Sequence, residues 1–292
     1  ARITKPLVSD GEERLAFVRE NSIKWACWTD SCRRAWAAHS AELRRMVRYE
    51  ELLADPVGGL EAVSRWIGIK RDREDLEAAV EAHGTATWVL AGGGTPAAAY
   101  RRLAAHDLRA GVEWDRVRVA MGDERCVPVT HPDSNWGLAA AALLDHVPVP
   151  GHQLLRPPGE LGAEAAADAY QAALAELPAA GGGPRLEVVW VGVGEDGHCL
   201  SLFPGRPEVE VADRLVVAVH DSPKPPPDRV SLTLAALAGT ERLLVLAAGA
   251  GKAAAVARAR AGDDRLPLTR AVQTVRAAGG SVTWLLDRAA TA

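Results

Sequence analysis

Short apolar runs alternate with longer amphipathic segments from about residue 85 to the end of the chain. The apolar runs that fit buried strands are residues 85–92, 115–123, 185–194, 214–220, 242–249 and 281–287. The segments that fit helices are residues 95–108, 134–147, 163–177 and 252–262, and residues 229–239 fit a strand that turns into a helix. Strands that are apolar on both faces and separated by helices predict an α/β fold, with a mainly parallel, Rossmann-like sheet covered by helices on both faces.

The first part of the chain has a different pattern, rich in charge, tryptophan and helix-forming residues. Helices are predicted at residues 33–46, 57–68 and 72–82. The last of these patterns ends at Gly84, and glycine commonly terminates a helix. We therefore expect a small helical segment over residues 1–84, followed by the α/β domain over residues 85–292.

Composition and charge exclude several classes of protein. The 292 residues carry a formal net charge of −4, which argues against a general nucleic-acid binder. Hydrophobic residues make up 48% of the chain, enough to bury a core without disulfide or metal cross-links. The four cysteines form no CxxC pair, and no apolar run reaches the roughly 18 residues of a membrane span. We expect a cytoplasmic protein that binds neither nucleic acid nor membrane.

A glycine-rich turn follows the first predicted strand, with the sequence Gly92-Gly93-Gly94-Thr95-Pro96. In a parallel α/β sheet, ligands bind at the carboxyl ends of the strands. Glycines let the backbone approach an anion, and the N–H groups of the following helix point at it. The turn therefore favours phosphate binding over a plain tight connection, although it is neither a GxGxxG fingerprint nor a Walker A motif.

Charged residues follow the second predicted strand, at Gly122-Asp123-Glu124-Arg125. Charges at the end of a buried strand are costly unless they are paired or serve chemistry. One interpretation is an Asp–Arg pair that pins the loop. The other places the cation of Arg125 against an anionic substrate or transition state, with the acids orienting it.

A histidine follows the central predicted strand, in the turn Asp196-Gly197-His198. An imidazole has an unperturbed pKa of about 6.5, which suits a general base near neutrality. Asp196 is placed to orient the imidazole or a water molecule. A lone loop histidine is the alternative, but two other polar strand ends are expected beside it. Ser201 lies outside a GxSxG motif and is interpreted as a hydroxyl on the helix side.

A proline-rich loop over residues 221–229 follows another strand and carries Lys224 and Arg229. The prolines stiffen the loop, so the two cations are presented in a fixed arrangement. The loop is either simply solvated or supplies a pair of cations for a substrate phosphate.

These turns together resemble the 6-phosphogluconolactonase family, within the wider glucosamine-6-phosphate isomerase/deaminase-like superfamily. The resemblance is carried by residues 90–96, 121–150, 190–205, 216–237 and 282–287, which occur in the family's order. It implies hydrolysis of 6-phosphoglucono-δ-lactone to 6-phosphogluconate without metal or cofactor, by a monomer or weak homodimer. An isomerase or deaminase acting on an amino-sugar phosphate, and a non-catalytic sugar-phosphate-binding protein, are the alternatives.

The resemblance also implies a role for each matching residue. It makes His198 the base that takes a proton from water, supported by Asp196. Further residues are expected to line the substrate pocket or hold the phosphate: Gly93, Gly94, Thr95, Asp123, Arg125, Lys224 and Arg229. Backbone N–H groups or a cation would stabilise the oxyanion that forms during attack on the lactone carbonyl.

Residues 47–69, with the sequence VRYEELLADPVGGLEAVSRWIGI, resemble the C-terminal end of a sulfotransferase. The phosphate-binding loop that a sulfotransferase carries far upstream is absent from the sequence. We therefore expect a fused or truncated remnant that has no sulfuryl-transfer activity.

Overall fold

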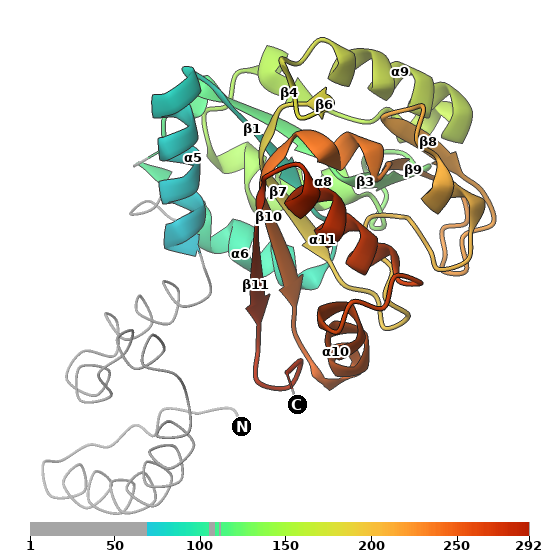
Figure 1. Ribbon diagram of the computed structural model, residues 1–292. Coiled ribbons are helices and arrows are strands. Elements are labelled where there is room, and N and C mark those ends of the chain that lie inside the picture. Colours follow the sequence, from blue (N-terminus) through green and yellow to red (C-terminus); the bar gives the residue numbers. More distant parts are fainter. Residues whose placement is uncertain (1–68, 105–108, 111, 292) are drawn as a thin grey trace, which may run out of the picture. The chain divides into compact units, whose positions relative to one another are not determined.

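The structure is a computed structural model that describes residues 69–104, 109–110 and 112–291 (Figure 1). The helices predicted over residues 33–46 and 57–68 lie outside the described residues, as does nearly all of the sulfotransferase-like segment. The chain divides into two compact units, Ala1–Trp66 and Ile67–Ala292. The described residues all belong to the second unit.

A six-stranded parallel sheet forms the centre of this unit (Figure 1). Its strand order is β11-β10-β7-β1-β2-β4. Every neighbouring pair is parallel, as the alternation of apolar runs and helices predicts. The strands are β1 (Ala86–Leu90), β2 (Val117–Met121), β4 (Leu154–Leu155), β7 (Leu186–Gly192), β10 (Thr240–Ala247) and β11 (Ser281–Leu286).

Helices cover both faces of this sheet, as predicted. One buried cluster contains Trp88 and Trp190 from the strands together with apolar residues of α5, α6 and α8. The other contains Val89 and Val189 with apolar residues of α9, α10 and α11. The helices are α5 (Ile69–His83), α6 (Gly94–Leu103), α8 (Asn135–Ala142), α9 (Ala163–Ala175), α10 (Ala253–Arg260) and α11 (Pro267–Ala277).

Several elements differ from the sequence-based prediction. Helix α11 was not predicted, although Leu268, Ala271, Val272 and Val275 are buried at helical spacing. The predicted strand-to-helix segment 229–239 is strand β9 (Arg229–Leu232) followed by a single 3₁₀ turn. The 3₁₀ turns are η1 (Trp114–Arg116), η2 (Leu144–His146), η3 (Gly151–Gln153), η4 (Gly159–Leu161), η5 (Pro207–Glu210), η6 (Ala235–Gly239) and η7 (Ala250–Lys252).

A second, antiparallel sheet stands beside the parallel one. It has the order β3-β9-β8, with β3 (Asp123–Arg125) and β8 (Val216–Val219) on either side of β9. The expectation that residues 214–220 and 229–232 belong to the parallel sheet is therefore wrong. A proline-rich loop joins β8 to β9 where a parallel pair would need a crossover helix, so the two strands pair antiparallel. A further hairpin pairs β5 (Ala179–Ala180) with β6 (Gly183–Pro184).

Helix α5 packs against the parallel sheet, with Leu76, Ala79 and Val80 buried against it. The predicted boundary at Gly84 assigns this helix to the preceding segment, whereas the compact unit that contains the sheet begins at Ile67. Gly84 has a φ of 75° and ends the helix inside that unit, so it marks a turn there.

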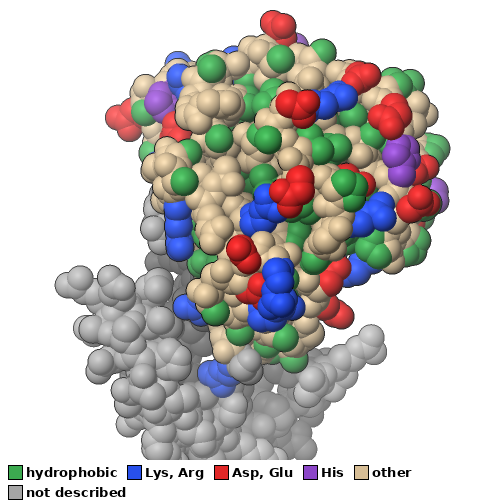
Figure 2. Space-filling model, turned by 45° about the vertical axis from the view of Figure 1, so that its right-hand side comes forward, with side chains coloured by type: hydrophobic (Ala, Val, Ile, Leu, Met, Phe, Trp, Pro, Cys, Tyr) green, Lys and Arg blue, Asp and Glu red, His purple; other side chains and the backbone are tan. Residues whose placement is uncertain are grey.

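Acidic and basic side chains are interspersed on the face of the molecule seen in Figure 2, in line with the small net charge. In the described part of the chain, no helix is both long and apolar enough to cross a membrane.

Candidate active site

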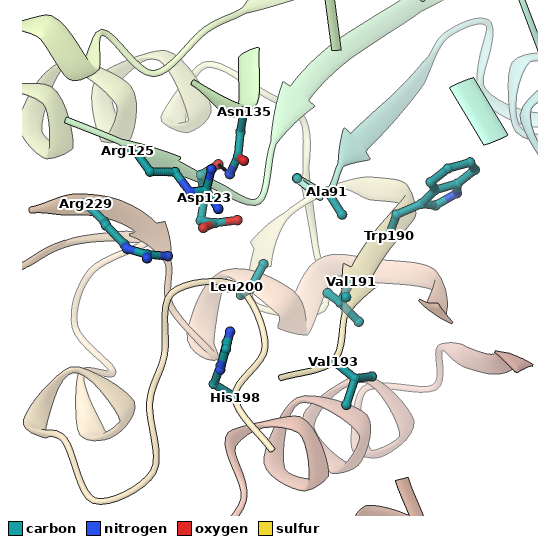
Figure 3. A pocket seen from close by; sticks show the side chains of 12 residues that line it. Ala91, Asp123, Arg125, Asn135, Trp190, Val191, Val193, His198, Leu200 and Arg229 are labelled. Carbon is teal, nitrogen blue, oxygen red and sulfur yellow. Dashed lines mark hydrogen bonds between the residues drawn. The ribbon is translucent and has the colours of Figure 1, made fainter. Parts of the chain in front are cut away.

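A pocket opens at the carboxyl ends of β1, β2 and β7, where ligands bind in parallel α/β sheets (Figure 3). Strand β3 and strand β9 of the antiparallel sheet complete its wall. The lining residues are Ala91, Gly92, Asp123, Arg125, Asn135, Trp190, Val191, Gly192, Val193, His198, Leu200 and Arg229.

The turn after β7 holds His198 against Asp196. The Nδ1 atom of His198 lies 2.6 Å from Oδ1 of Asp196. Since a carboxylate accepts but cannot donate, the proton of the neutral imidazole sits on Nδ1 and the lone pair on Nε2. The ring packs on Phe203 with 4.6 Å between ring centroids, so its orientation is fixed from two sides.

Gly194 makes room for this pair. A Cβ atom at Gly194 would lie 2.0 Å from Nδ1 of His198 and 2.4 Å from Oδ1 of Asp196. The backbone N–H of Gly194 also donates to the carbonyl of His198 at 2.8 Å. The glycine therefore allows the turn to close tightly around the histidine–aspartate pair.

The electrostatic surroundings keep the imidazole neutral. Burial lowers the pKa of His198 below its ordinary value, the Asp196 carboxylate counteracts this in part, and the charge of Lys224 lowers the pKa further. Burial by itself would raise the pKa of Asp196. The charge and the hydrogen bonds of His198 have a larger combined effect in the opposite direction, so the pKa of Asp196 lies below its ordinary value. At neutral pH the site thus offers an unprotonated nitrogen beside an ionised carboxylate, the arrangement of a general base.

Arg229 is buried and organises the proline-rich loop. Its guanidinium donates to the backbone carbonyls of Pro226 at 3.0 Å, Lys224 at 2.8 Å and Pro225 at 3.2 Å. It also reaches Ser201 Oγ at 3.3 Å, and that hydroxyl donates to Asp123 Oδ2 at 2.7 Å. Arg229 therefore joins the loop that carries Lys224 to the wall that carries Asp123.

Glu124 anchors the next element of the site. Its buried carboxylate accepts the backbone N–H of Asn135 and of Trp136, each at 2.7 Å, and the hydroxyl of Ser134 at 3.0 Å. The backbone N–H of Arg125 donates to it as well, at 2.7 Å. Burial raises the pKa of Glu124, and these hydrogen bonds oppose the rise. The carboxylate thus fixes the start of α8 against β3.

Four of the residues singled out from the sequence line one pocket: Asp123, Arg125, His198 and Arg229. Asp196 holds His198 through the hydrogen bond described above. The remaining four lie at the same end of the sheet but are exposed: Gly93, Gly94 and Thr95 at the start of α6, and Lys224 in the proline-rich loop.

Gly92 and Asn135 also line the pocket, although neither was assigned a role at the site from the sequence. They depend on each other, since a Cβ atom at Gly92 would lie 1.9 Å from Oδ1 of Asn135. The available signal is Ser134, a residue type that favours the N-cap position, which places Asn135 at the start of the helix that follows the polar strand end.

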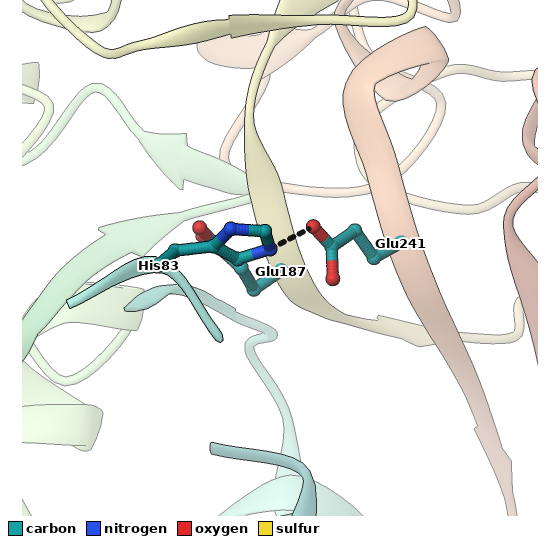
Figure 4. A group of neighbouring side chains, drawn as sticks. All are labelled: His83, Glu187 and Glu241. Carbon is teal, nitrogen blue, oxygen red and sulfur yellow. Dashed lines mark hydrogen bonds and ion pairs between the residues drawn. The ribbon is translucent and has the colours of Figure 1, made fainter. Parts of the chain in front are cut away.

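A second cluster of titratable groups lies at the opposite end of the strands (Figure 4). This cluster, found among the described residues, consists of His83, Glu187 and Glu241. An imidazole nitrogen of the histidine and one carboxylate oxygen of each glutamate all lie within 4.8 Å of one another. Nε2 of His83 is 2.9 Å from Oε1 of Glu241, while Oε2 of Glu187 accepts the N–H of Thr87 at 2.6 Å. These bonds tie the end of α5 to β10 and the start of β1 to β7.

The fold and the pocket define an α/β protein with a partly buried His–Asp pair and two arginines at the carboxyl ends of its strands. Residues 69–284 match the family described as glucosamine-6-phosphate isomerases/6-phosphogluconolactonase. The chain belongs to this family, and the match does not include the sulfotransferase-like residues 47–68.

Relatives within the family carry a more specific name. A 6-phosphogluconolactonase of Mycobacterium tuberculosis is 43% identical over 223 residues, covering 74% of this chain and 88% of the relative. One of Streptomyces coelicolor is 40% identical over 215 residues, covering 71% of this chain and 81% of the relative. The three-dimensional structure of 6-phosphogluconolactonase from Trypanosoma brucei superposes with a TM-score of 0.68 at 29% identity, covering 78% of this chain and 94% of that one.

Proposed function

We propose that this chain hydrolyses 6-phospho-D-glucono-1,5-lactone to 6-phospho-D-gluconate, a step of the oxidative pentose phosphate pathway. The observation that carries the proposal is the imidazole of His198, held 2.6 Å from Asp196 in a pocket that also contains Arg125 and Arg229. The lactonases to which the chain is 43% and 40% identical support the choice of substrate.

His198 acts as the general base. Its Nε2 atom takes a proton from a water molecule, whose oxygen then forms a bond to C1 of the lactone. The bond between C1 and the ring oxygen breaks next, and the imidazolium returns its proton to that leaving oxygen. Asp196 keeps the reactive tautomer in place and stabilises the imidazolium while it exists.

Arg125 supplies positive charge for the oxyanion that forms at the lactone carbonyl. One of its terminal nitrogens donates to the carbonyl of Asp133 at 2.7 Å, which fixes the side chain. Its Nε is buried and has no hydrogen-bond partner among the described residues, so we expect it to donate to an anionic oxygen of the substrate. A fixed donor aimed at developing charge lowers the barrier because it need not reorganise during the reaction.

The proline-rich loop and the glycine turn hold the rest of the substrate. Lys224 presents an exposed ammonium group at the site, and Arg229 fixes its position through the carbonyls of the loop. We assign the substrate phosphate to this pair of cations. Helix α6 begins at the same end of the sheet, with Gly93 at its N-cap. We assign the backbone N–H groups of Gly93, Gly94 and Thr95 to contacts with the sugar phosphate. Binding energy at the phosphate positions the reacting carbon against the base.

An isomerase or deaminase acting on an amino-sugar phosphate is the second candidate. It needs a carboxylate that abstracts a proton from carbon, and Asp123 lines the pocket. The hydroxyl of Ser201 already donates to Oδ2 of Asp123 at 2.7 Å, however, so this carboxylate oxygen is engaged by a hydrogen bond within the wall.

The deciding experiment offers the purified full chain both substrates. Lactone hydrolysis is followed by coupling 6-phosphogluconate to its dehydrogenase, and deamination of glucosamine 6-phosphate is followed as ammonia release. The proposal predicts turnover of the lactone only. Turnover of glucosamine 6-phosphate alone would establish the second candidate, and binding of 6-phosphogluconate without turnover of either would establish a non-catalytic binding protein.

A cytoplasmic setting and a monomeric or weakly dimeric state complete the proposal. Cys126 and Cys199 are free thiols, as a reducing compartment requires. Burial raises the pKa of Cys126 to about 11 and that of Cys199 to about 12, so neither thiol is reactive at neutral pH. Sedimentation of the full chain over a range of concentrations tests the oligomeric state.

A further inference from the structure

The side chain of Asn135 ends in a buried acceptor at the pocket wall. Asn135 is 1% exposed, begins α8 and lines the pocket. Its Oδ1 atom has no hydrogen-bond partner within the described residues. Buried polar atoms are nearly always paired, so an orphaned acceptor in a pocket points to a ligand that brings the donor.

The orientation of this amide is fixed by its neighbours. Its Nδ2 atom donates to the backbone carbonyl of Asp123 at 2.9 Å. A carbonyl only accepts, so the nitrogen of the amide must face Asp123 and Oδ1 must face away from it. The backbone N–H of Asn135 is bound by Glu124 at 2.7 Å, so the residue cannot swing out of the wall.

Gly92 allows the amide of Asn135 to lie close to the backbone of the glycine-rich turn. A Cβ atom at that position would lie 1.9 Å from Oδ1 of Asn135, closer than any side chain could sit. Both residues line the pocket, and Figure 3 shows the amide of Asn135 between Asp123 and Ala91. The orphaned acceptor therefore lies in the wall of the pocket, next to the glycine-rich turn.

We propose that Asn135 determines specificity by accepting, at Oδ1, a hydrogen bond from one ring hydroxyl of the sugar lactone. This inference rests on the lactonase function proposed above. The phosphate dianion and the lactone carbonyl carry no donor, so a ring hydroxyl is the part of the substrate that fits an acceptor. A sugar without that hydroxyl leaves Oδ1 unpaired in the complex, and sites of this kind discriminate strongly.

The test compares the unmodified lactone with its 2-deoxy, 3-deoxy and 4-deoxy analogues, each phosphorylated at C6. For the wild-type chain, kcat/KM should fall by about 10- to 100-fold for the analogue that lacks the bound hydroxyl, the cost of one unpaired buried acceptor. In Asn135→Ala, kcat/KM for the unmodified lactone should no longer exceed that for this analogue. The ratios of kcat/KM between the unmodified lactone and the two other analogues should stay as in the wild type. Asn135→Leu, close in volume and without an acceptor, gives the same comparison if the alanine variant folds poorly.

Asn135→Asp is the matched control because it keeps an acceptor at the same position. The new carboxylate cannot donate to the backbone carbonyl of Asp123, so the overall activity should fall. The ratio of kcat/KM between the unmodified lactone and the analogue without the bound hydroxyl should persist. A residue that merely supports Asp123 would instead lower kcat/KM for all four lactones by one factor, and this result would overturn the inference. Turnover of the unmodified lactone by the wild-type chain reports separately on the proposed function.

Discussion

Arg125 of β3 lies directly opposite Arg229 of β9 in the antiparallel pair that borders the pocket. Like charges at facing positions of a sheet normally destabilise it. Backbone carbonyls of the proline-rich loop surround the Arg229 guanidinium, whereas Nε of Arg125 has no hydrogen-bond partner in the part of the chain that the structure describes. The pair concentrates positive charge at the pocket and so favours an anionic ligand.

Replacing Arg125 by glutamine should lower kcat/KM for the lactone by about 10²- to 10³-fold, the usual effect of removing one oxyanion donor. The coupled lactonase assay measures the change. Arg156→Gln is the matched control, since Arg156 pairs with Glu160 outside the pocket, and its activity should equal that of the wild type. Unaltered activity in Arg125→Gln would remove this arginine from the mechanism.

Gly194→Ala should abolish most of the activity while leaving the fold intact. The added methyl group would lie 2.0 Å from Nδ1 of His198, so the imidazole must move away from Asp196. A displaced general base costs about 10²-fold or more in kcat. Gly151→Ala is the control, because a Cβ atom there meets no described residue within 4 Å. Circular dichroism checks folding, and a fully active Gly194→Ala variant would contradict the described geometry.

The pH profile should respond to Lys224. The acid limb of kcat/KM reports the pKa of the free enzyme's base, which burial places below the ordinary histidine value of about 6.5. The charge of Lys224 lowers this pKa further, so Lys224→Ala should move the acid limb to higher pH. Lys252→Ala, with its lysine outside the pocket, should leave the limb in place. A shift to lower pH in Lys224→Ala would show that the two groups do not interact as described.

Glu124→Gln should destabilise the protein by about 2 kcal/mol, because each carboxylate oxygen accepts two donors and an amide can satisfy only one such oxygen. Chemical denaturation measures the free energy of unfolding. Glu160→Gln, which removes only a half-exposed ion pair with Arg156, should cost less than about 1 kcal/mol. Equal effects of the two substitutions would mean that Glu124 does not anchor α8.

The strands of the parallel sheet could be predicted from the sequence because both of their faces are apolar. Strand β7, for example, is buried along nearly its whole length. Strand β3 could not be predicted, since Asp123, Glu124 and Arg125 show no alternation of apolar and polar residues. Pairing with β9, far along the chain, is what makes them a strand. Local pattern cannot reveal such a partner.

Only part of the candidate site could be predicted from the sequence, as was the case for the fold. His198 and Asp196 lie two residues apart in one turn, so their pairing could be anticipated from the sequence. The orphaned oxygen of Asn135 could not, because it depends on the missing side chain of Gly92 in a different turn. The sequence also gave no indication that the Arg229 guanidinium is engaged by its own loop.

The lactonase activity of His198→Ala tests the central claim most directly. The coupled assay is run on the wild type, on His198→Ala, and on His152→Ala, whose exposed histidine lies outside the pocket. Removal of the general base should lower kcat by at least about 100-fold in His198→Ala, with His152→Ala unaffected. Equal rates of lactone hydrolysis in all three proteins would contradict the account.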